Sequence, residues 1–174
     1  DCMDDHHGFS TNQPLMLAAE SQLLATADLV VVSSQVLMEK VASHARKAIL
    51  VRNGVDYHHF AAVAAIRHPP VAQLTVGYYG AIADWFDSEL VGILATLRPT
   101  WRFVLIGDTF SADLVPIAQP NIELAGEQPY SQLPHLIRDW DCCIIPFKRV
   151  PLTEATNPVK VYEMLAAGKP VVAV

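Results

Sequence analysis

The stretch from Cys142 to Val174, CCIIPFKRVPLTEATNPVKVYEMLAAGKPVVAV, contains two apolar segments with a helical pattern between them. The apolar segments, 142–147 and 171–174, have the short, nearly continuous hydrophobic character of strands that are buried on both faces. Nearly continuous apolar strands that are separated by a helix are typical of a parallel sheet covered on both faces. The stretch therefore predicts a β–α–β unit and the α/β fold class.

The helix within this stretch has a signal at each end. Asn157 is a good N-cap, because its side-chain oxygen can accept from a free backbone N–H of the first turn. Pro158 suits the first helical position, and Gly168 can adopt the left-handed conformation just past the last turn. We expect a short helix between these residues.

Two charged residues near the start of this helix point to a bound anion. Lys160 lies in the first turn, where the positive end of the helix dipole disfavours a cation by up to about 1 kcal/mol. An anion would reverse this effect, because free N–H groups and the ammonium would then act together. Glu163 shares a face with Lys160, so a cation for phosphate lies beside a carboxylate for a diol. The pair favours a nucleotide ligand, and the alternative is a solvated ion pair of little energetic value.

The residues before this stretch repeat the alternation of strands and helices. Strands are expected over 74–79, 101–106 and 122–125, and helices over 86–97, 111–118 and 131–140. Right-handed crossovers then build a doubly wound, Rossmann-like parallel sheet with helices on both faces. Ligands of such sheets bind beyond the carboxyl ends of the strands, where the Lys160 helix and the loops at Gly80, Gly107 and Gly126 meet.

The first third of the chain predicts part of another α/β domain. It shows helical patterns over 12–27 and 34–44 and strands over 28–33 and 47–51. We therefore divide the chain into a C-terminal remnant of a first Rossmann-like domain over 1–60, a linker over 61–73 and a second domain over 74–174. We expect the first domain to be incomplete here, because it shows only two strands and two helices. We expect the second to be incomplete as well, because its last strand reaches residue 174 with no helix after it.

The composition describes a folded protein and excludes several functional classes. With 52% hydrophobic and 17% charged residues the chain can bury a core, and no apolar run is long enough to predict a transmembrane segment. A net charge of −6 argues against a nucleic-acid partner. The cysteines Cys2, Cys142 and Cys143 form neither a disulfide framework nor a metal-ligand spacing. The missing metal-ligand spacing leads us to expect no bound metal. Because a disulfide framework and a signal peptide are both missing, we expect a cytoplasmic protein.

Four motifs together resemble the group 1 glycosyltransferases (family 4), which are retaining enzymes with the two-domain GT-B fold. The motifs are ADLVVVSS at 27–34, NGVD at 53–56, VGYYG at 76–80 and PVKVYEMLAAGKP at 158–170. The first is similar to a late strand of the family's N-terminal domain, and the second to its interdomain segment. The third is similar to the first strand and glycine loop of the donor domain, and the last matches the signature helix PxKxxExxAxGxP. The resemblance covers nearly the whole chain.

The resemblance implies transfer of a sugar from a nucleotide diphosphate sugar, UDP- or GDP-linked, to a saccharide or lipid-linked acceptor. The anomeric configuration would be retained. It implies no cofactor besides the donor substrate and no metal, so preorganised N–H groups and a cation must stabilise the leaving diphosphate. We expect the isolated chain to lack transfer activity, because the acceptor pocket needs the rest of the first domain.

The same resemblance assigns roles to individual residues. Lys160 and Glu163 are the expected catalytic residues: Lys160 would meet the phosphates together with the Val159 N–H, and Glu163 would accept from both ribose hydroxyls. Gly80 would allow close backbone approach to the diphosphate, and Tyr130 would lie near the base. The expected nucleotide-binding set is Gly80, Tyr130, Asn157, Val159, Lys160 and Glu163.

This chain departs from the family's pattern at two places. Much of the family has a second Glu eight residues before the ribose Glu, in contact with the donor sugar, but this chain has Ala155 there and Glu154 one residue earlier. Many members also carry an Arg and a Lys after the glycine loop, whereas residues 81–87 contain neither. Lys160 would then be the main phosphate cation of this chain.

Two other functions stay open at this point. One is a non-catalytic nucleotide-sugar-binding module, which Ala155 favours, and the other is a GT-B nucleotide-sugar epimerase. Peripheral association with the inner face of a membrane would have to come from segments outside this chain.

Overall fold

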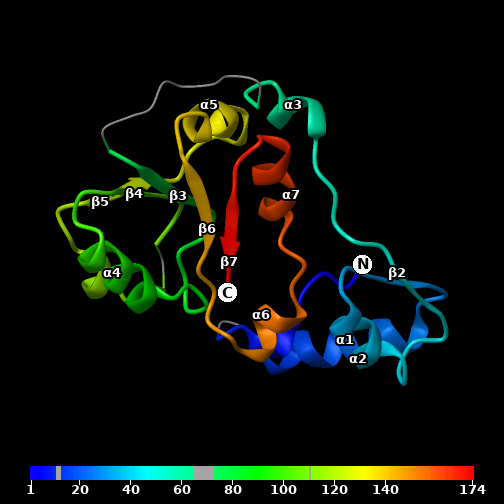
Figure 1. Ribbon diagram of the computed structural model, residues 1–174. Helices are drawn as coiled ribbons and strands as arrows, with labels where there is room; N and C mark the ends of the chain where they lie inside the picture. Colours follow the sequence, from blue (N-terminus) through cyan, green and yellow to red (C-terminus); the bar gives the residue numbers. More distant parts are fainter. Residues whose placement is uncertain (11–12, 65–72, 110) are drawn as a thin grey trace. The chain divides into compact units, whose positions relative to one another are not determined.

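The computed structural model describes residues 1–10, 13–64, 73–109 and 111–174, which form two compact units (Figure 1). Unit 1 contains residues 1–54 and 149–158, and unit 2 contains residues 55–148 and 159–174. The chain thus returns to unit 1 through the ten residues that precede the signature helix. Most of the expected linker, including both of its prolines, lies outside the described residues.

Unit 1 has a two-stranded parallel sheet. In it β1 (Val30–Val32) pairs with β2 (Ala48–Leu50), and α2 (Gln35–Val41) connects them. The N-terminus of α2 is fixed by the Ser34 side chain, which accepts from the Leu37 N–H at 3.2 Å. The remaining elements of this unit are η1 (His6–Gly8), α1 (Pro14–Thr26) and α6 (Pro151–Ala155). The predicted strands and the two predicted helices of this part are present with shorter bounds.

Unit 2 contains a five-stranded parallel sheet in the order β5-β4-β3-β6-β7. Its strands are β3 (Thr75–Tyr79), β4 (Arg102–Ile106), β5 (Ile122–Gly126), β6 (Cys142–Ile145) and β7 (Val171–Ala173). Each lies within two residues of its predicted bounds. The predicted α/β, Rossmann-like parallel sheet is therefore confirmed.

Helices cover both faces of this sheet, because the strand order reverses at β3. The chain runs outward from β3 through β4 to β5, and then returns to β6 and β7 on the other side of β3. Right-handed crossovers place these two sets of connections on opposite faces. The first set contains α4 (Ser88–Leu97) and η2 (Val115–Ile117), and the second contains η3 (Tyr130–Gln132), α5 (Leu133–Ile137) and α7 (Val159–Ala166) (Figure 1). In addition, α3 (Tyr57–Ala61) contacts α7.

Several predicted helices differ in the structure. The helix expected over 111–118 is only the single turn η2, because Pro116 has no backbone N–H and its ring would clash with a preceding helical carbonyl. The helix expected over 131–140 is divided into η3 and α5 and ends at Ile137. The helix α4 begins at Ser88 because the Asp87 side chain accepts from the Leu90 N–H at 2.8 Å. The sequence did not predict α3 or α6, each of which has only five residues.

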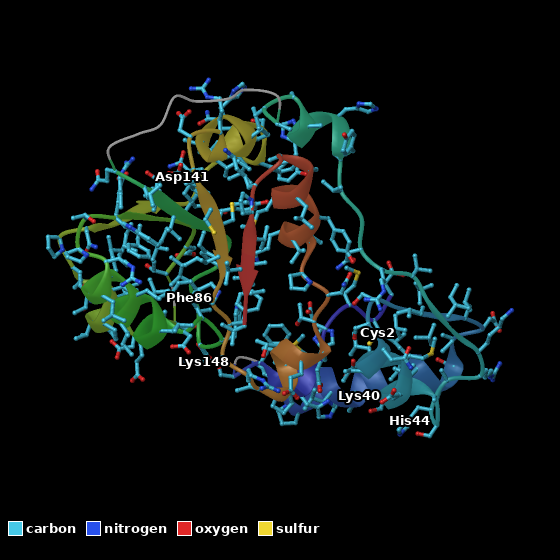
Figure 2. All side chains as sticks on the ribbon, viewed as in Figure 1. Cys2, Lys40, His44, Phe86, Asp141 and Lys148 are labelled. Carbon is cyan, nitrogen blue, oxygen red and sulfur yellow. The ribbon has the colours of Figure 1, made fainter. Side chains whose placement is uncertain are left out.

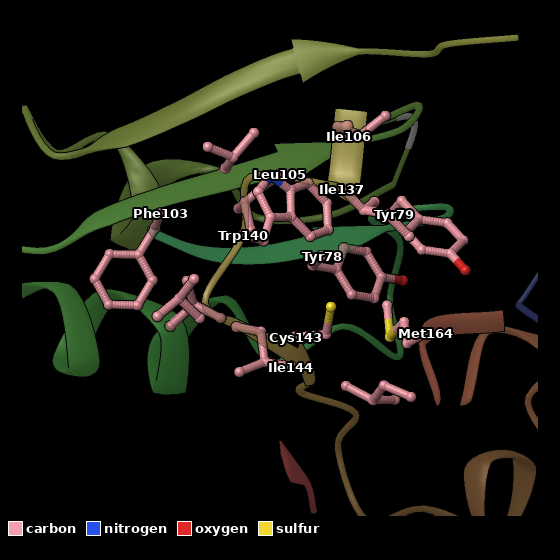
Figure 3. Close-up of a cluster of buried hydrophobic side chains, with 14 of the residues drawn as sticks. Tyr78, Tyr79, Phe103, Leu105, Ile106, Ile137, Trp140, Cys143, Ile144 and Met164 are labelled. Atoms are coloured by element: carbon pink, nitrogen blue, oxygen red, sulfur yellow. The ribbon is translucent and has the colours of Figure 1, made fainter. Parts of the chain in front are cut away.

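The core of unit 2 is built around aromatic side chains that pack on the sheet. Trp140 is 5% exposed and lies among Leu105, Tyr78 and Tyr79 in Figure 3. Its indole also fills the space beside Gly77 in β3, where an added Cβ would come within 2.0 Å of indole carbons. A side chain at position 77 is therefore incompatible with Trp140 in its present place.

Candidate functional site

The expected site residues of unit 2 gather at the carboxyl ends of β3 and β6. β3 ends at Tyr79 and leads into Gly80, and β6 ends at Ile145, two residues before Phe147. The side chain of Lys160, in the first turn of α7, reaches both of these loops. The reversal of strand order lies between β3 and β6, and crevices at such points are where doubly wound sheets bind ligands.

The helix α7, which carries Lys160 and Glu163, has a well-defined C-terminal end. It begins at Val159, one residue later than expected. At the other end Gly168 adopts φ +70°, its N–H donates to the Leu165 carbonyl at 2.9 Å, and the Lys169 N–H donates to the Met164 carbonyl at 3.0 Å. These two bonds form a Schellman motif and satisfy carbonyls of the last turn. The predicted left-handed role of Gly168 is confirmed.

Two aromatic rings hold the Lys160 side chain. Its Nζ lies 5.0 Å from the ring centroid of Phe147 and 5.5 Å from that of Tyr78. Both rings are buried, and the Tyr78 hydroxyl donates to the Ala81 carbonyl at 2.8 Å, which fixes its orientation. Ring faces attract a cation electrostatically, in a contact that does not itself occupy the ammonium N–H donors. The ammonium is therefore localised by contacts that are compatible with binding an anion.

The contact with Phe147 can be tested with Phe147→Leu in the full-length protein. Losing the ring should weaken diphosphate binding about 2- to 5-fold, the scale of one cation–π contact of roughly 0.5–1 kcal/mol. Phe103→Leu is the matched control, because Phe103 is also buried in the core of unit 2, whereas the rings that lie over Lys160 Nζ are those of Tyr78 and Phe147. Calorimetric titration should show weaker binding for Phe147→Leu alone, and an equal loss in both variants would contradict the positioning role.

The backbone of Gly80 lies directly beside Lys160. Its φ of +126° is rarely adopted by residues with a side chain, and an added Cβ would lie 2.8 Å from Lys160 Cε and 3.0 Å from Nζ. Its N–H donates to the Ile106 carbonyl at 2.9 Å, which ties the loop to β4. Glycine here keeps the space around the ammonium open while the backbone passes close to it.

Glu163 is a buried carboxylate, with only 5% of the residue exposed. The Tyr79 hydroxyl donates to its Oε2 at 2.7 Å. Tyr79 is itself buried, and burial together with the Glu163 contact raises the pKa of its phenol, so the hydroxyl keeps its proton. The bond supplies a partner that a buried carboxylate requires.

Tyr130 lies between α3 and Glu163. Its ring stacks on His59, with centroids 5.2 Å apart and planes inclined by 26°, and meets the edge of Phe60 at 5.7 Å. Burial, and then the charge of Glu163 and hydrogen bonding to it, raise the pKa of Tyr130 to about 12. Tyr130 remains half exposed, so the structure places it at the surface beside Glu163 with His59 against one face of its ring.

Asn157, the other expected site residue, belongs to unit 1. Its Oδ1 accepts from the Asn53 N–H at 2.9 Å, and its backbone carbonyl accepts from Asn53 Nδ2 at 2.6 Å. These bonds attach the NGVD segment to the residues that precede α7. The contacts with Asn53 therefore give Asn157 a structural role within unit 1.

The departure at Ala155 has a structural context in unit 1. Ala155 is 1% exposed at the end of α6, and its carbonyl accepts from the Ser34 hydroxyl at 2.5 Å. The neighbouring Glu154 is exposed, and its Oε1 lies 3.7 Å from Arg149 Nη2. Ala155 is thus part of the packed core of this unit, and Glu154 forms a surface ion pair.

Another cation near the glycine loop has a different partner. Lys148, labelled in Figure 2 with Phe86, donates from its Nζ to the Asp84 carbonyl at 2.8 Å.

Among the described residues no group of three or more His, Cys, Asp and Glu side chains could hold a metal ion. In the same part of the chain, no helix combines the length and apolar character needed to cross a membrane.

Comparison with known proteins identifies the family. The model of the family "Glycosyl transferases group 1" matches residues 73–174. The chain belongs to the group 1 glycosyltransferases. It is also 30% identical over 167 residues to a Bacillus subtilis (strain 168) protein that bears the name teichuronic acid biosynthesis glycosyltransferase TuaH, with 89% of this chain and 42% of that protein covered. This group 1 glycosyltransferase chain thus spans less than half the length of that relative.

Solved structures share the fold of this group 1 glycosyltransferase. Sucrose-phosphate synthase from Thermosynechococcus elongatus superposes with a TM-score of 0.71 at 19% identity, over 94% of this chain and 45% of that one. HepE from Anabaena, in complex with UDP-glucose, gives a TM-score of 0.66 at 18% identity, over 97% and 50%. These similarities confirm the predicted GT-B fold with its Rossmann-like domain.

The candidate site includes side chains that sequence analysis did not single out. The VGYYG motif contains Tyr78 and Tyr79, but its resemblance concerned the strand and the glycine loop. Phe147 and His59 belong to no charged pattern or motif spacing. Phe147 contacts Lys160, Tyr79 contacts Glu163, and His59 contacts Tyr130. These contacts arise only when separate segments of the chain pack together.

Proposed function

We propose that the full-length protein transfers a sugar from a nucleotide diphosphate sugar to an acceptor, with retention of the anomeric configuration. The observation that carries this proposal is the pairing, in the first two turns of α7, of a ring-held Lys160 beside Gly80 with a buried Glu163. The pair lies at the edge of the sheet where ligands of this fold class bind.

In the proposed complex the diphosphate occupies the start of α7. Helix N-termini bind anions through the N–H groups of the first turn, and here those would be the N–H groups of Val159 and Lys160, which would donate to phosphate oxygens. The Lys160 ammonium adds a full charge, and Gly80 lets the backbone pass close to the ligand. As the bond to the sugar breaks, negative charge grows on the leaving diphosphate, and fixed donors stabilise that charge without reorganising.

In the same complex the nucleoside lies over Glu163 and Tyr130. One carboxylate can accept from two neighbouring hydroxyls, so Glu163 suits the 2′- and 3′-hydroxyls of a ribose. Tyr130 is half exposed beside it and would contact the base. We propose a UDP- or GDP-linked donor, and the UDP-glucose bound to the structurally similar HepE supports the uridine nucleotide.

We also propose how the rest of the protein takes part. Residues 1–60 would belong to the acceptor-side domain, residues 61–73 to the linker and residues 74–174 to the donor domain. The acceptor would be a saccharide or a lipid-linked saccharide, and the name of the Bacillus subtilis relative, which refers to teichuronic acid biosynthesis, supports a polysaccharide pathway. We place the reaction in the cytoplasm, with any attachment to the inner membrane face made by other segments.

Calorimetric titration of the full-length protein with UDP, GDP and ADP, each with and without EDTA, tests the proposal. We expect one diphosphate to bind in preference to the others, with the same affinity in EDTA, because Lys160 and helix N–H groups carry the phosphate contacts. Absence of binding for all three would contradict the proposed donor site. Binding that disappears in EDTA would contradict the metal-independent mechanism.

One observation favours a second function, a non-catalytic nucleotide-sugar-binding module. Ala155 stands where much of the family has a sugar-contacting Glu, and it is packed in the core of unit 1. Mass spectrometry separates the two functions, because it can detect release of the sugar from the bound donor and its covalent transfer to an acceptor. Donor binding without any turnover would favour the module.

A further inference from the structure

We propose that Tyr79 is a positioning residue that fixes the Glu163 carboxylate for the ribose hydroxyls of the donor. The Tyr79 hydroxyl donates to Glu163 Oε2 at 2.7 Å, and both residues are 5% exposed. This inference rests on the proposed function, because it concerns the ligand that Glu163 would bind. It adds Tyr79, a residue of β3, to the expected nucleotide-binding set.

The position of the Tyr79 hydroxyl is set by the sheet. Tyr79 is the last residue of β3 and is paired in register with Ile106 of β4. Its ring packs near Trp140, with centroids 6.4 Å apart, in the buried cluster that Figure 3 shows. A phenol anchored in this way presents its hydroxyl from a rigid element, whereas the Glu163 side chain has three rotatable bonds.

The bond also leaves the Glu163 carboxylate able to accept hydrogen bonds from a ligand. A phenol whose pKa is raised by burial stays protonated at physiological pH, so Tyr79 can only donate to the carboxylate at that pH. A carboxylate has about four acceptor positions, so the bond from Tyr79 to Oε2 and hydrogen bonding with Tyr130 still leave capacity for two ribose hydroxyls. Without that bond the carboxylate would lose its buried donor and would be less ordered before the ligand binds, at a cost in affinity.

The expected consequence is a loss of discrimination for ribose hydroxyls. Whichever of UDP, GDP and ADP binds the full-length protein would be titrated together with its 2′,3′-dideoxy analogue. We expect Tyr79→Phe to weaken binding of the ribonucleotide about 5- to 10-fold and to leave affinity for the dideoxy analogue within about 2-fold of the wild type. Glu163→Gln should likewise reduce the ratio of the affinity for the ribonucleotide to the affinity for the dideoxy analogue. The variant with both substitutions should show little further reduction of this ratio, because both changes remove the same interaction.

A control separates this effect from a general loss of order. Tyr57→Phe removes the same hydroxyl group from an exposed tyrosine on α3 and should change neither affinity. Equal weakening of both nucleotides by Tyr79→Phe would indicate a merely structural role and overturn the inference, while the proposed function would stand. An unchanged ratio would overturn it as well. A wild type that binds no diphosphate, or that does not discriminate the dideoxy analogue, would instead overturn the proposed role of Glu163.

Discussion

Replacement of Lys160 by alanine is expected to weaken diphosphate binding by the full-length protein about 10- to 100-fold, the range of one lost charge-assisted interaction. The reason is local, since the start of α7 is the positive end of the helix dipole and Lys160 adds a charge held by Phe147 and Tyr78. Sugar transfer should fall by at least the same factor, because the charge on the leaving group grows in the transition state. Calorimetry and a steady-state transfer assay would measure the two effects.

Lys148→Ala is the matched control for this experiment. It removes the same charge from the loop that follows β6, but its Nζ donates to the Asp84 carbonyl. We expect its effect on diphosphate affinity to stay within about 3-fold, as for a charge that acts only through a partly screened field. A larger loss in Lys148→Ala than in Lys160→Ala would move the phosphate site away from α7.

Gly77→Ala is expected to destabilise the protein by about 3 kcal/mol, through overpacking against Trp140. The new Cβ would lie 2.0 Å from Cδ2 and Cε3 of the indole, which is buried between the sheet and its helices. Neither β3 nor a rigid ring can move far, so the whole cluster would have to shift. The midpoint of thermal unfolding should fall by on the order of 10 °C, as followed by circular dichroism.

Two further variants make this prediction specific. Gly54→Ala is the control, because an added Cβ at position 54 meets nothing within 4 Å. Trp140→Leu in the Gly77→Ala background should recover part of the loss, since a smaller side chain makes room for the methyl group. Equal unfolding temperatures for Gly77→Ala and Gly54→Ala would show that the sheet accommodates the methyl group without strain.

Much of unit 2 was predictable because its signals are short in range. The apolar run from Cys142 and the segment at 171–174 predicted β6 and β7, and Gly168 marked the end of α7. Hydrophobic runs and end signals act within a few residues, so they can be recognised without knowing the tertiary fold. The five-residue helix α6 was missed, because a single turn has almost no periodicity to detect.

Charge spacing predicted candidate site residues along α7, and the family resemblance added residues outside it, among them Gly80 and Tyr130. Lys160 and Glu163 stand three residues apart on one helix, so their spacing alone places them on a common face. The partner of Glu163 is 84 residues away in β3, and the ring nearest to Lys160 follows β6. Neither contact has a sequence signal, because each depends on the register of parallel strands and on the packing of α7 against them.

The sequence by itself determined the α/β class and the order of the strands and longer helices, and it predicted which residues of α7 would meet a nucleotide. Those features follow from local hydrophobic patterns, helix-end residues and charge spacing. Only the tertiary structure decided that Tyr79 donates to Glu163, that two buried rings hold Lys160 and that Ala155 lies in the core of unit 1. These contacts join segments far apart in the chain, and their geometry exists only after the sheet and its helices have packed.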